Sequence, residues 1–328
     1  MTQIAISEIE TVARQALVAH GASDTVATTM ADAIAWAEAR DNRICGLYYL
    51  ESYCKQLLTG RVKGQAVPEV SKPRPGIVEV DAKYGFAQPA FAKAFDTGRT
   101  AARENGLASI LVRHAHTCTA LGWFTDAIAR AGLIGMGYTN ASPIVAPPGG
   151  KTRMIGTNPM SFAVPDGDGG VAMMFDQSTT TVALGRITMA KAAGEQIPEG
   201  WAVDAEGHPT TDPEAALSGS LCSVGGYKGW GLGLMVEIMA AGLAGGTASR
   251  DVRPLKAPEG HPHDLGHCFL LIDPGVRPDF HAMVAGLADA VLQDDGARMP
   301  GRGKRLHETV DVPDALWDAT CRLAARKD

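Results

Sequence analysis

The chain has 328 residues, of which 45% are hydrophobic and 20% are charged, and its formal net charge at pH 7 is −6. This length allows two or three domains with large apolar cores, and the composition is that of a globular protein. The acidic balance, without a basic stripe, disfavours nucleic-acid binding, because neutralising phosphates requires concentrated lysine and arginine.

The first 60 residues predict helices. "ISEIETVARQALVAH" has helical periodicity, with Ser7 as the expected cap and Gly21 at the end. "DTVATTMADAIAWAEARD" follows, with Asp24 as its expected cap. The N-terminus lacks the basic and apolar regions of a signal peptide, so we expect a cytoplasmic protein.

Apolar strand-like runs then alternate with helical runs. "GIVEVDA", "LASILVRHA", "LIGMGYTNA" and "VAMMFD" predict strands, whereas "PAFAKAFDTGRTAARENG" and "GWFTDAIARAG" predict helices. This alternation predicts an α/β domain with a central sheet.

The rest of the chain combines a long apolar segment, an irregular loop and terminal helices. "GWGLGLMVEIMAAGLAGG" contains Glu237 and many glycines, which favours a buried helix over a membrane span. "GTASRDVRPLKAPEGHPHDLGH" predicts a long loop before the strand "CFLLIDP". From Pro278 the pattern is helical again, and both chain ends are expected to form one helical domain. We expect residues 1–112 plus 280–328 in that domain and residues 113–279 in a cofactor-binding α/β domain.

Several common site signatures are missing from the sequence. No GxGxxG lies at a strand-to-helix turn with an acidic residue about 20 positions later, which excludes a Rossmann fingerprint. "GGKT" imitates a phosphate loop, but the position of its first glycine holds Val145. The six cysteines form no CxxC pair, and the histidines of "GHPHDLGH" fit a solvated loop better than a zinc site, so we expect neither disulfides nor a metal.

Two short motifs allow a ligand contact or an ordinary turn. "GGYKGWG" places Lys228 beside the exposed N–H groups of a helix start, which suits a phosphate or carboxylate. "IGTNP" places the polar Thr157 and Asn158 between apolar flanks. Each pattern is equally typical of a tight turn, so both readings stay open.

Taken together, "GFAQPAF", "TNASPIVAPPGG", "IGTNPMSFAVP", "FDQSTTT", "GGYKGWGLGLMVEIMAAGLAG" and "RMPG" resemble the type 2 malate/L-lactate dehydrogenase family. The resemblance runs over nearly the whole chain. It implies a non-Rossmann α/β fold in which a central mixed-sheet cofactor domain joins a helical domain built from both ends. "VDAKYGFAQPA" and "RMPG" look most like the branch that reduces cyclic ketimines such as Δ1-pyrroline-2-carboxylate and Δ1-piperideine-2-carboxylate.

The resemblance also implies a homodimer that binds NADPH or NADH between its domains. NADPH is the expectation, because Arg302, Lys304 and Arg305 could bind a 2′-phosphate, although a charged loop can equally be solvated. The implied cofactor contacts are His116, Thr117, Cys118, Thr119, Ala120, Asp176, Ser178, Thr179, Lys228, Gly229, Arg302 and Arg305.

The chain departs from the family at its acid–base residues. Where the family usually has Ser-His-Gly, with the histidine as proton donor, this sequence has Ile44-Cys45-Gly46. An acidic residue of the ketimine branch corresponds to Arg186, and a second family histidine corresponds to Thr117, with His116 just before it.

The chemistry of hydride transfer indicates which class of substrate can be reduced without these acid–base residues. Hydride addition to a ketone creates an alkoxide and needs a proton donor, to which a histidine contributes roughly 10² to 10⁴-fold. A protonated imine accepts hydride and leaves a neutral amine. We therefore expect a ketimine reductase in which Cys45, His116, Asp176 and Arg186 are the catalytic candidates and Arg43, Tyr49 and Thr157 are substrate-binding candidates.

Two alternatives stay open. The chain could be a 2-oxo acid or 2-hydroxy acid dehydrogenase with a substitute donor such as His116, or a non-catalytic nucleotide-binding member of the family. Cys45 could equally be a small buried hydrophobe, and His116 an ordinary packing residue. In each case we expect a small-molecule ligand and neither nucleic-acid nor membrane binding.

Overall fold

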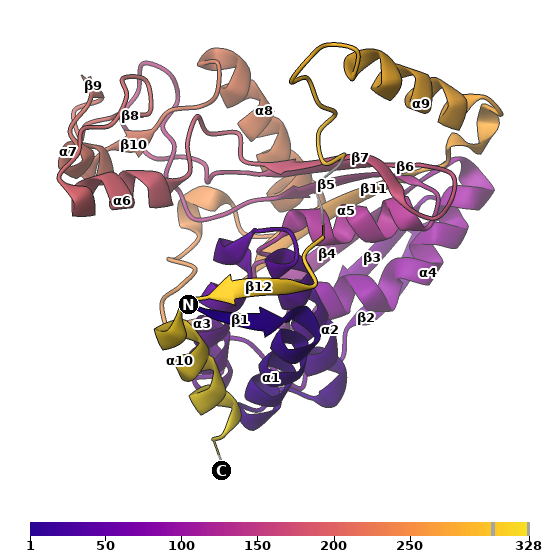
Figure 1. The fold of residues 1–328 in the computed structure, drawn as a ribbon, viewed down its shortest axis with the longest axis horizontal. Helices are drawn as coiled ribbons and strands as arrows, with labels where there is room; N and C mark the ends of the chain where they lie inside the picture. The colour runs from indigo at the N-terminus through magenta and orange to yellow at the C-terminus, as the bar shows by residue number, and fades with distance from the viewer. Residues whose placement is uncertain (303–305, 327–328) are drawn as a thin grey trace.

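The computed structural model describes residues 1–302 and 306–326. Its centre is a seven-stranded mixed sheet in the order β2-β3-β4-β11-β5-β6-β7 (Figure 1). The strands are β2 (Glu69–Arg74), β3 (Ile77–Asp81), β4 (Leu107–Ala115), β5 (Ile134–Thr139), β6 (Met160–Pro165), β7 (Val171–Gln177) and β11 (Leu265–Ile272). This sheet confirms the predicted α/β class and contains all the predicted strands, whereas β2 and β6 were not predicted.

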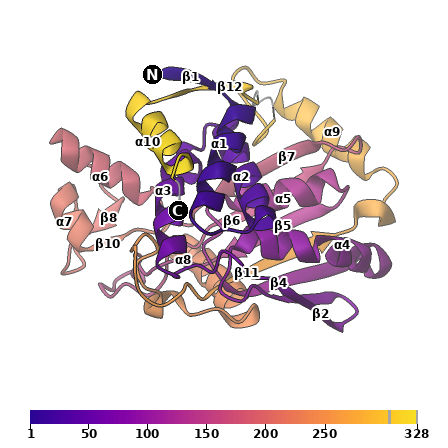
Figure 2. The same cartoon turned by 90° about the horizontal axis from the view of Figure 1, so that it is seen from below.

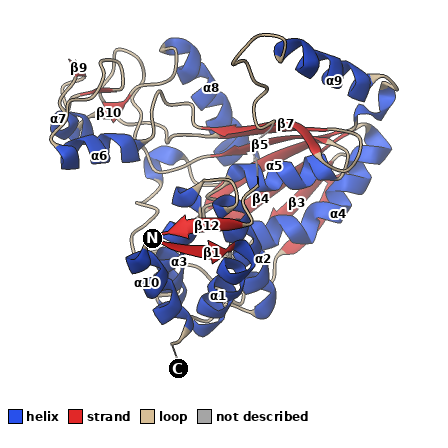
Figure 3. Ribbon diagram, in the orientation of Figure 1, coloured by secondary structure: helices blue, strands red, loops and turns tan. Residues whose placement is uncertain are grey.

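Helices cover both faces of the sheet (Figure 3). β3 and β4 are parallel, and α4 (Ala87–Asn105) crosses between them, because parallel strands need a long connection. α4 and α5 (Leu121–Arg130) cover one face, and α8 (Tyr227–Glu237) lies on the other. β11 pairs antiparallel with both β4 and β5, and its apolar sequence follows from burial on both sides.

A group of aromatic rings fixes α4 and α5 on the sheet. Phe124 on α5 stacks on Phe269 of β11 with ring centroids 4.7 Å apart. Phe91 of α4 meets both rings edge-on, at 5.1 Å and 4.9 Å. All three side chains are buried, so the start of α5 is held rigidly against the strands.

The two chain ends form one helical layer beside the sheet (Figure 2). β1 (Thr2–Ala5) pairs antiparallel with β12 (Thr309–Val312), and α10 (Asp314–Ala324) packs on α1 (Ile6–Ala19). α2 (Asp24–Glu38) and α3 (Leu47–Leu58) complete the layer around a shared apolar core.

The division into two domains at the expected residue numbers stays a prediction. The expected boundary at 112/113 falls inside β4. α9 (Phe280–Val291) lies over the sheet rather than in the helical layer (Figure 1).

A smaller lobe extends from one end of the sheet. It contains α6 (Leu184–Ala193), α7 (Pro213–Ser218) and the short strands β8 (Ala202–Val203), β9 (Pro209–Thr210) and β10 (Ser220–Leu221). It has its own apolar core around Val145, Ile155 and Ile187. The sequence patterns did not predict this three-stranded sheet, because strands of two residues carry no readable periodicity.

Two expected helix caps were wrong. α1 begins at Ile6, before Ser7, and no side chain caps it. α2 is capped by Ser23, whose hydroxyl accepts from the Val26 N–H at 3.3 Å, and Asp24 is its first residue. Side-chain capping is decided by which oxygen reaches the free N–H groups, and two adjacent polar residues can compete for that role.

The long apolar segment is not a buried helix in this chain. It forms α8 and then a π-helix, Ile238–Leu243. The small residues, among them Gly233 and Ala240, face the protein, whereas 73% of Tyr227 and 65% of Ile238 are exposed. No helix in the described residues is long and apolar enough to cross a membrane.

Candidate active site

The candidate site lies where the helical layer meets the sheet. Cys45 ends a short 3-10 helix, Arg43–Cys45, just before α3. Gly46 makes this turn possible, because a Cβ there would come within 2.2 Å of the Glu38 carboxylate. That carboxylate accepts from the Leu47 N–H at 2.7 Å and so fixes the start of α3.

Asp176 reaches the same region from β7. Its carboxylate accepts from the Gly122 N–H at 2.7 Å, at the start of α5, where a helix favours negative charge. The surrounding protein nevertheless raises the pKa of Asp176 to about 6, because desolvation outweighs the hydrogen bonds from Gly122 and Leu121. The residue as a whole is nevertheless exposed to solvent. Asp176 is therefore a carboxylate that titrates close to neutral pH.

The Cys45 thiol is neutral at physiological pH. Burial and then the charge of Asp176 raise its pKa to about 12, and Asn42 and Lys256 oppose that rise only in part. A thiol is a nucleophile only as the thiolate, so this cysteine is a poor nucleophile and a poor proton donor.

Two tyrosines line the wall between Cys45 and the segment 116–120. Tyr53 is buried, and its hydroxyl donates to Thr119 Oγ1 at 3.0 Å. The Tyr49 ring lies 5.4 Å from the Tyr53 ring, and burial raises the pKa of Tyr49 to about 12, with a smaller contribution from Cys45. Both phenols are neutral hydrogen-bonding groups.

His116 lies behind this wall and is buried. Gln56 donates its amide hydrogens to the carbonyls of Leu255 and Ala257, at 2.8 and 2.9 Å, so its Oε1 must accept from His116 Nε2 at 2.6 Å. Nδ1 therefore carries no proton, and it has no hydrogen-bond partner among the described residues. Burial, followed by the neighbouring His263, keeps the pKa of His116 well below its usual value. The ring is neutral, and its single proton is already donated to Gln56.

A cavity of about 710 Å³ opens from Asp176 along β7 and α5. Its lining includes four arginines, namely Arg40, Arg130, Arg298 and Arg302. Arg40 and Arg130 both pair with Asp126, at 3.2 and 2.7 Å, whereas Arg302 is 3.6 Å from Asp289. The lining also contains Asp41, Asp126 and Asp176, so Arg298 and Arg302, the two arginines that are not paired with Asp126, are the ones that suit the phosphates of a dinucleotide.

The structure separates the predicted cofactor residues into groups. Asp176 and Arg302 line the cavity, whereas the segment 116–120 is mostly buried beside it. Thr179 accepts at its carbonyl from the Val224 N–H at 3.0 Å, which places Ser178 and Thr179 beside the turn before Lys228 and Gly229. Arg305 lies outside the described residues.

The remaining substrate and catalytic candidates do not converge on Cys45. Arg43 lies two residues before it in sequence but is exposed. Arg186 is exposed on α6, and the described residues show no ion pair or hydrogen bond of its side chain. Thr157 uses its carbonyl to accept from Thr179 at 3.0 Å.

The structure adds Lys256, which the sequence patterns did not single out. It comes from the loop of residues 252–264, and its ammonium lies 4.2 Å from the Tyr48 ring and 4.5 Å from the Tyr49 ring. Its only sequence signal is a lone lysine in a proline-rich loop, which is equally typical of a solvated surface residue. Only the fold brings it to Cys45.

The expectation of a solvated loop was wrong for two histidines of "GHPHDLGH", because His263 in the loop and His267 in β11 are buried and act as neutral partners. His263 Nε2 accepts from Arg61 Nε at 3.2 Å, and His267 shares a hydrogen bond of 2.7 Å with Thr139. Burial lowers the pKa of His263 and of His267 to about 4. Within residues 1–302 and 306–326, no group of three acidic, histidine or cysteine side chains is placed to hold a metal ion.

Comparison with known proteins supports one family. The family model described as malate/L-lactate dehydrogenase matches residues 4–319. A (2R)-3-sulfolactate dehydrogenase (NADP(+)) of Chromohalobacter salexigens is 37% identical, over 96% of each chain. A Delta(1)-pyrroline-2-carboxylate reductase of Ancylobacter novellus is 36% identical, over 99% of this chain and 98% of the relative. The crystal structure of delta1-piperideine-2-carboxylate reductase from Pseudomonas syringae has a TM-score of 0.91 at 31% identity, covering 98% of this chain and 100% of the other.

Proposed function

The chain belongs to the malate/L-lactate dehydrogenase family, and from that premise we propose that it is an NADPH-dependent reductase of a cyclic ketimine carboxylate. The substrate is Δ1-pyrroline-2-carboxylate or Δ1-piperideine-2-carboxylate, and the product is the saturated cyclic amino acid. One observation carries the proposal. Cys45 is a neutral thiol beside a carboxylate that is ionised at neutral pH, a pair that suits a cation better than a ketone.

The residues of the site favour a substrate that arrives protonated. The Asp176 carboxylate is close enough to Cys45 for its charge to raise the pKa of the thiol, and it can stabilise the positive charge of an iminium nitrogen. The neutral Cys45 thiol and the Tyr49 phenol shape the wall around the ring without adding a charge. No proton from the protein is needed when hydride reaches the iminium carbon, because the nitrogen already carries one.

The cavity beside Asp176 would hold the dinucleotide, which supplies the hydride. Arg298 and Arg302 are the candidates for the phosphate that distinguishes NADPH from NADH, because guanidinium groups bind phosphate through two hydrogen bonds. Gly301 allows the chain to pass close to β7, since a Cβ there would lie 2.6 Å from the Met174 carbonyl oxygen. We propose a cytoplasmic homodimer as the working form.

Reduction of a 2-oxo acid is the second candidate. The 37% identity to a sulfolactate dehydrogenase favours it. The site itself opposes it, because an alkoxide needs a donor poised near neutral pH. Neither the thiol of Cys45 nor the neutral ring of His116 meets that requirement, and Asp176, with a pKa of about 6, is mostly ionised at pH 7.

The test is the decay of NADPH absorbance, with NADH in parallel, after adding the protein to Δ1-pyrroline-2-carboxylate or to pyruvate. We expect rapid oxidation of NADPH with the imine and little with pyruvate. Faster turnover of pyruvate would replace the proposal by the second candidate. Tight NADPH binding without turnover of any imine or oxo acid would indicate a non-catalytic member of the family.

A further inference from the structure

We propose that Lys256 binds the carboxylate of the substrate, and that the loop of residues 252–264 is therefore an element of substrate specificity. The identity of the ring that carries this carboxylate rests on the proposed function. The assignment of Lys256 as the cation rests on the contacts described below.

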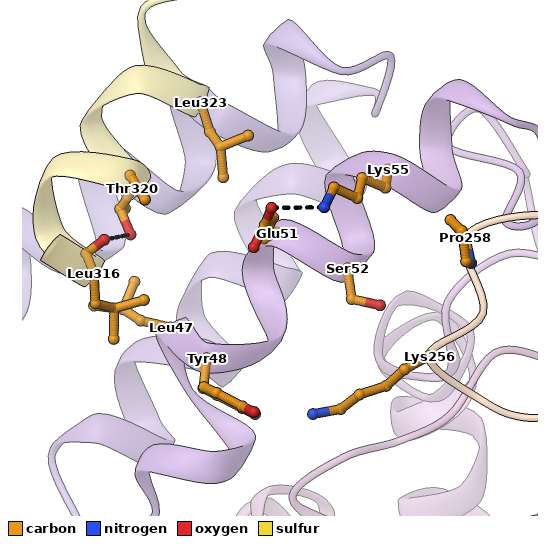
Figure 4. Close-up of a pocket in the computed structure, with 11 residues that line it drawn as sticks. Leu47, Tyr48, Glu51, Ser52, Lys55, Lys256, Pro258, Leu316, Thr320 and Leu323 are labelled. Carbon is orange, nitrogen blue, oxygen red and sulfur yellow. Dashed lines mark hydrogen bonds and ion pairs between the residues drawn. The ribbon is translucent and has the colours of Figure 1, made fainter.

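Lys256 lines a second cavity, which shares no lining residue with the cavity beside Asp176, and its contact with Tyr49 joins it to the wall of the candidate site. Figure 4 shows its side chain extending from the loop toward Tyr48 across a cavity of about 350 Å³. The rings of Tyr48 and Tyr49 hold the ammonium by cation–π contacts at 4.2 and 4.5 Å. Ser52 lines the same cavity, and its hydroxyl is buried without a hydrogen-bond partner among the described residues.

The charge of Lys256 has no protein counterion in the part of the chain that the structure describes. Lys55 lines the same cavity but is already paired with Glu51 at 2.6 Å. Partial burial lowers the pKa of Lys256, so its charged form lacks some of its hydration. An incoming carboxylate would supply the missing partner, whereas Lys55 already has one.

The loop is clamped on both sides of Lys256 by side chains at the end of α3. Gln56 donates to the carbonyls of Leu255 and Ala257, the two neighbours of Lys256. Arg61 donates to three loop carbonyls at 2.7 to 3.0 Å, namely those of Pro254, Ala257 and Glu259. Thr59 donates to the carbonyl of Pro258 at 2.7 Å.

These bonds give Lys256 a fixed position before any ligand arrives. A cation that is held in place loses little conformational entropy on binding, so it contributes more affinity than a free surface lysine. The clamp also explains the two buried histidines. His116 orients Gln56 by donating to its Oε1, and His263 orients Arg61 by accepting from its Nε. His116 is thus a positioning residue.

The binding test uses pyrrole-2-carboxylate, a planar ring with the same carboxylate and no reducible C=N bond. Its affinity for the protein with NADPH is measured by calorimetry in the wild type, in Lys256→Met and in the matched control Lys55→Met. We expect Lys256→Met to weaken binding by roughly 10- to 100-fold, the effect of one charge-assisted hydrogen bond. Lys55→Met should leave affinity within about twofold, because its partner is Glu51. NADPH affinity should be unchanged in both variants.

Three results would overturn the proposal: unchanged affinity in Lys256→Met, equal weakening in both variants, or no binding of the probe to the wild type. A second measurement separates this inference from the proposed function. In the reductase assay Lys256→Met should raise KM far more than it lowers kcat. If the probe binds through Lys256 but no imine is reduced, the anion site stands and the ketimine reductase proposal fails.

Discussion

At the scale of single residues, the site is defined by what Cys45 cannot do. A half-buried thiol with a pKa of about 12 neither donates a proton nor attacks an electrophile near neutral pH. The ionisable group with a pKa suited to chemistry in this region is Asp176, at about 6. At pH 7 most of Asp176 is the carboxylate and not the acid, which matches a substrate that brings its own proton.

Replacing the thiol by an imidazole tests this interpretation. Cys45→His should raise the rate of pyruvate reduction by at least about 10-fold, because a poised histidine contributes roughly 10² to 10⁴-fold to proton transfer. The rate of NADPH oxidation with pyruvate measures the effect, and Cys222→His in the smaller lobe is the control. If both variants reduce pyruvate equally, proton donation at position 45 does not limit the reaction.

The pH profile tests Asp176. Its carboxylate is ionised above about pH 6, so kcat/KM for the ketimine should fall as the pH drops through about 6. Asp176→Asn should lose this limb and be slower at pH 7.5 by roughly 10- to 100-fold, the worth of one charged hydrogen bond. If kcat/KM of the variant still falls as the pH drops through about 6, another group is responsible for that fall.

The same raised pKa has a consequence for stability. The folded protein favours the protonated form of Asp176, so this contribution is complete below about pH 4 and is lost as the pH rises through about 6. The Tm of Asp176→Asn relative to the wild type should therefore be higher at pH 7.5 than at pH 4, as thermal unfolding at the two pH values would show.

At the scale of elements, α3 organises the site through its two ends. Its first turn carries Tyr48 and Tyr49, which contact Lys256, and its last turn carries Gln56, which holds the loop that bears Lys256. One helix therefore sets both the wall of the site and the position of its cation. A shift of α3 would move the two together.

At the start of α8 the backbone of Gly229 passes close to that of Val224. A Cβ at Gly229 would lie 2.0 Å from the Val224 carbonyl oxygen, whereas a Cβ at Gly231, two residues later, meets nothing within 4 Å. Gly229→Ala should lower Tm, because the turn before α8 has to open. Gly231→Ala should be neutral or stabilise by about 0.5–1 kcal/mol through its higher helix propensity. Thermal unfolding of the two variants measures this, and equal Tm changes would contradict the predicted close contact.

At the scale of the whole molecule, several large apolar side chains of α8 and the π-helix are exposed, and no other part of the described chain covers them. Tyr227, Ile238 and Leu243 are 73%, 65% and 52% exposed. Exposed apolar surface of this extent is typical of a protein interface, which fits the proposed homodimer.

A charge in this surface tests the dimer. Ile238→Asp should convert the dimer to a monomer in sedimentation velocity, because burying an unpaired carboxylate in an interface is costly. Val67→Asp, at a position that is 74% exposed elsewhere, should leave the dimer intact. A wild-type monomer at micromolar concentration would refute the proposal.

The sequence by itself determined the α/β class, most strands of the sheet, and the family. These features rest on local periodicity and on motifs such as "FDQSTTT", which are readable along one stretch of chain. Asp176 and Arg302 were also predicted from that resemblance, and both line one cavity. The replacement at Cys45 was visible in the sequence as a departure from the family pattern.

Only the tertiary structure decided the roles of His116 and Lys256. His116 is 60 residues from Gln56, and Lys256 lies about 200 residues from the tyrosines that hold it, so no periodicity relates these positions. Whether a histidine is a proton donor depends on its burial and on the partner of each ring nitrogen. Whether a lysine is solvated or poised depends on the counterions around it. Both are properties of packing between distant segments, and a local pattern does not contain them.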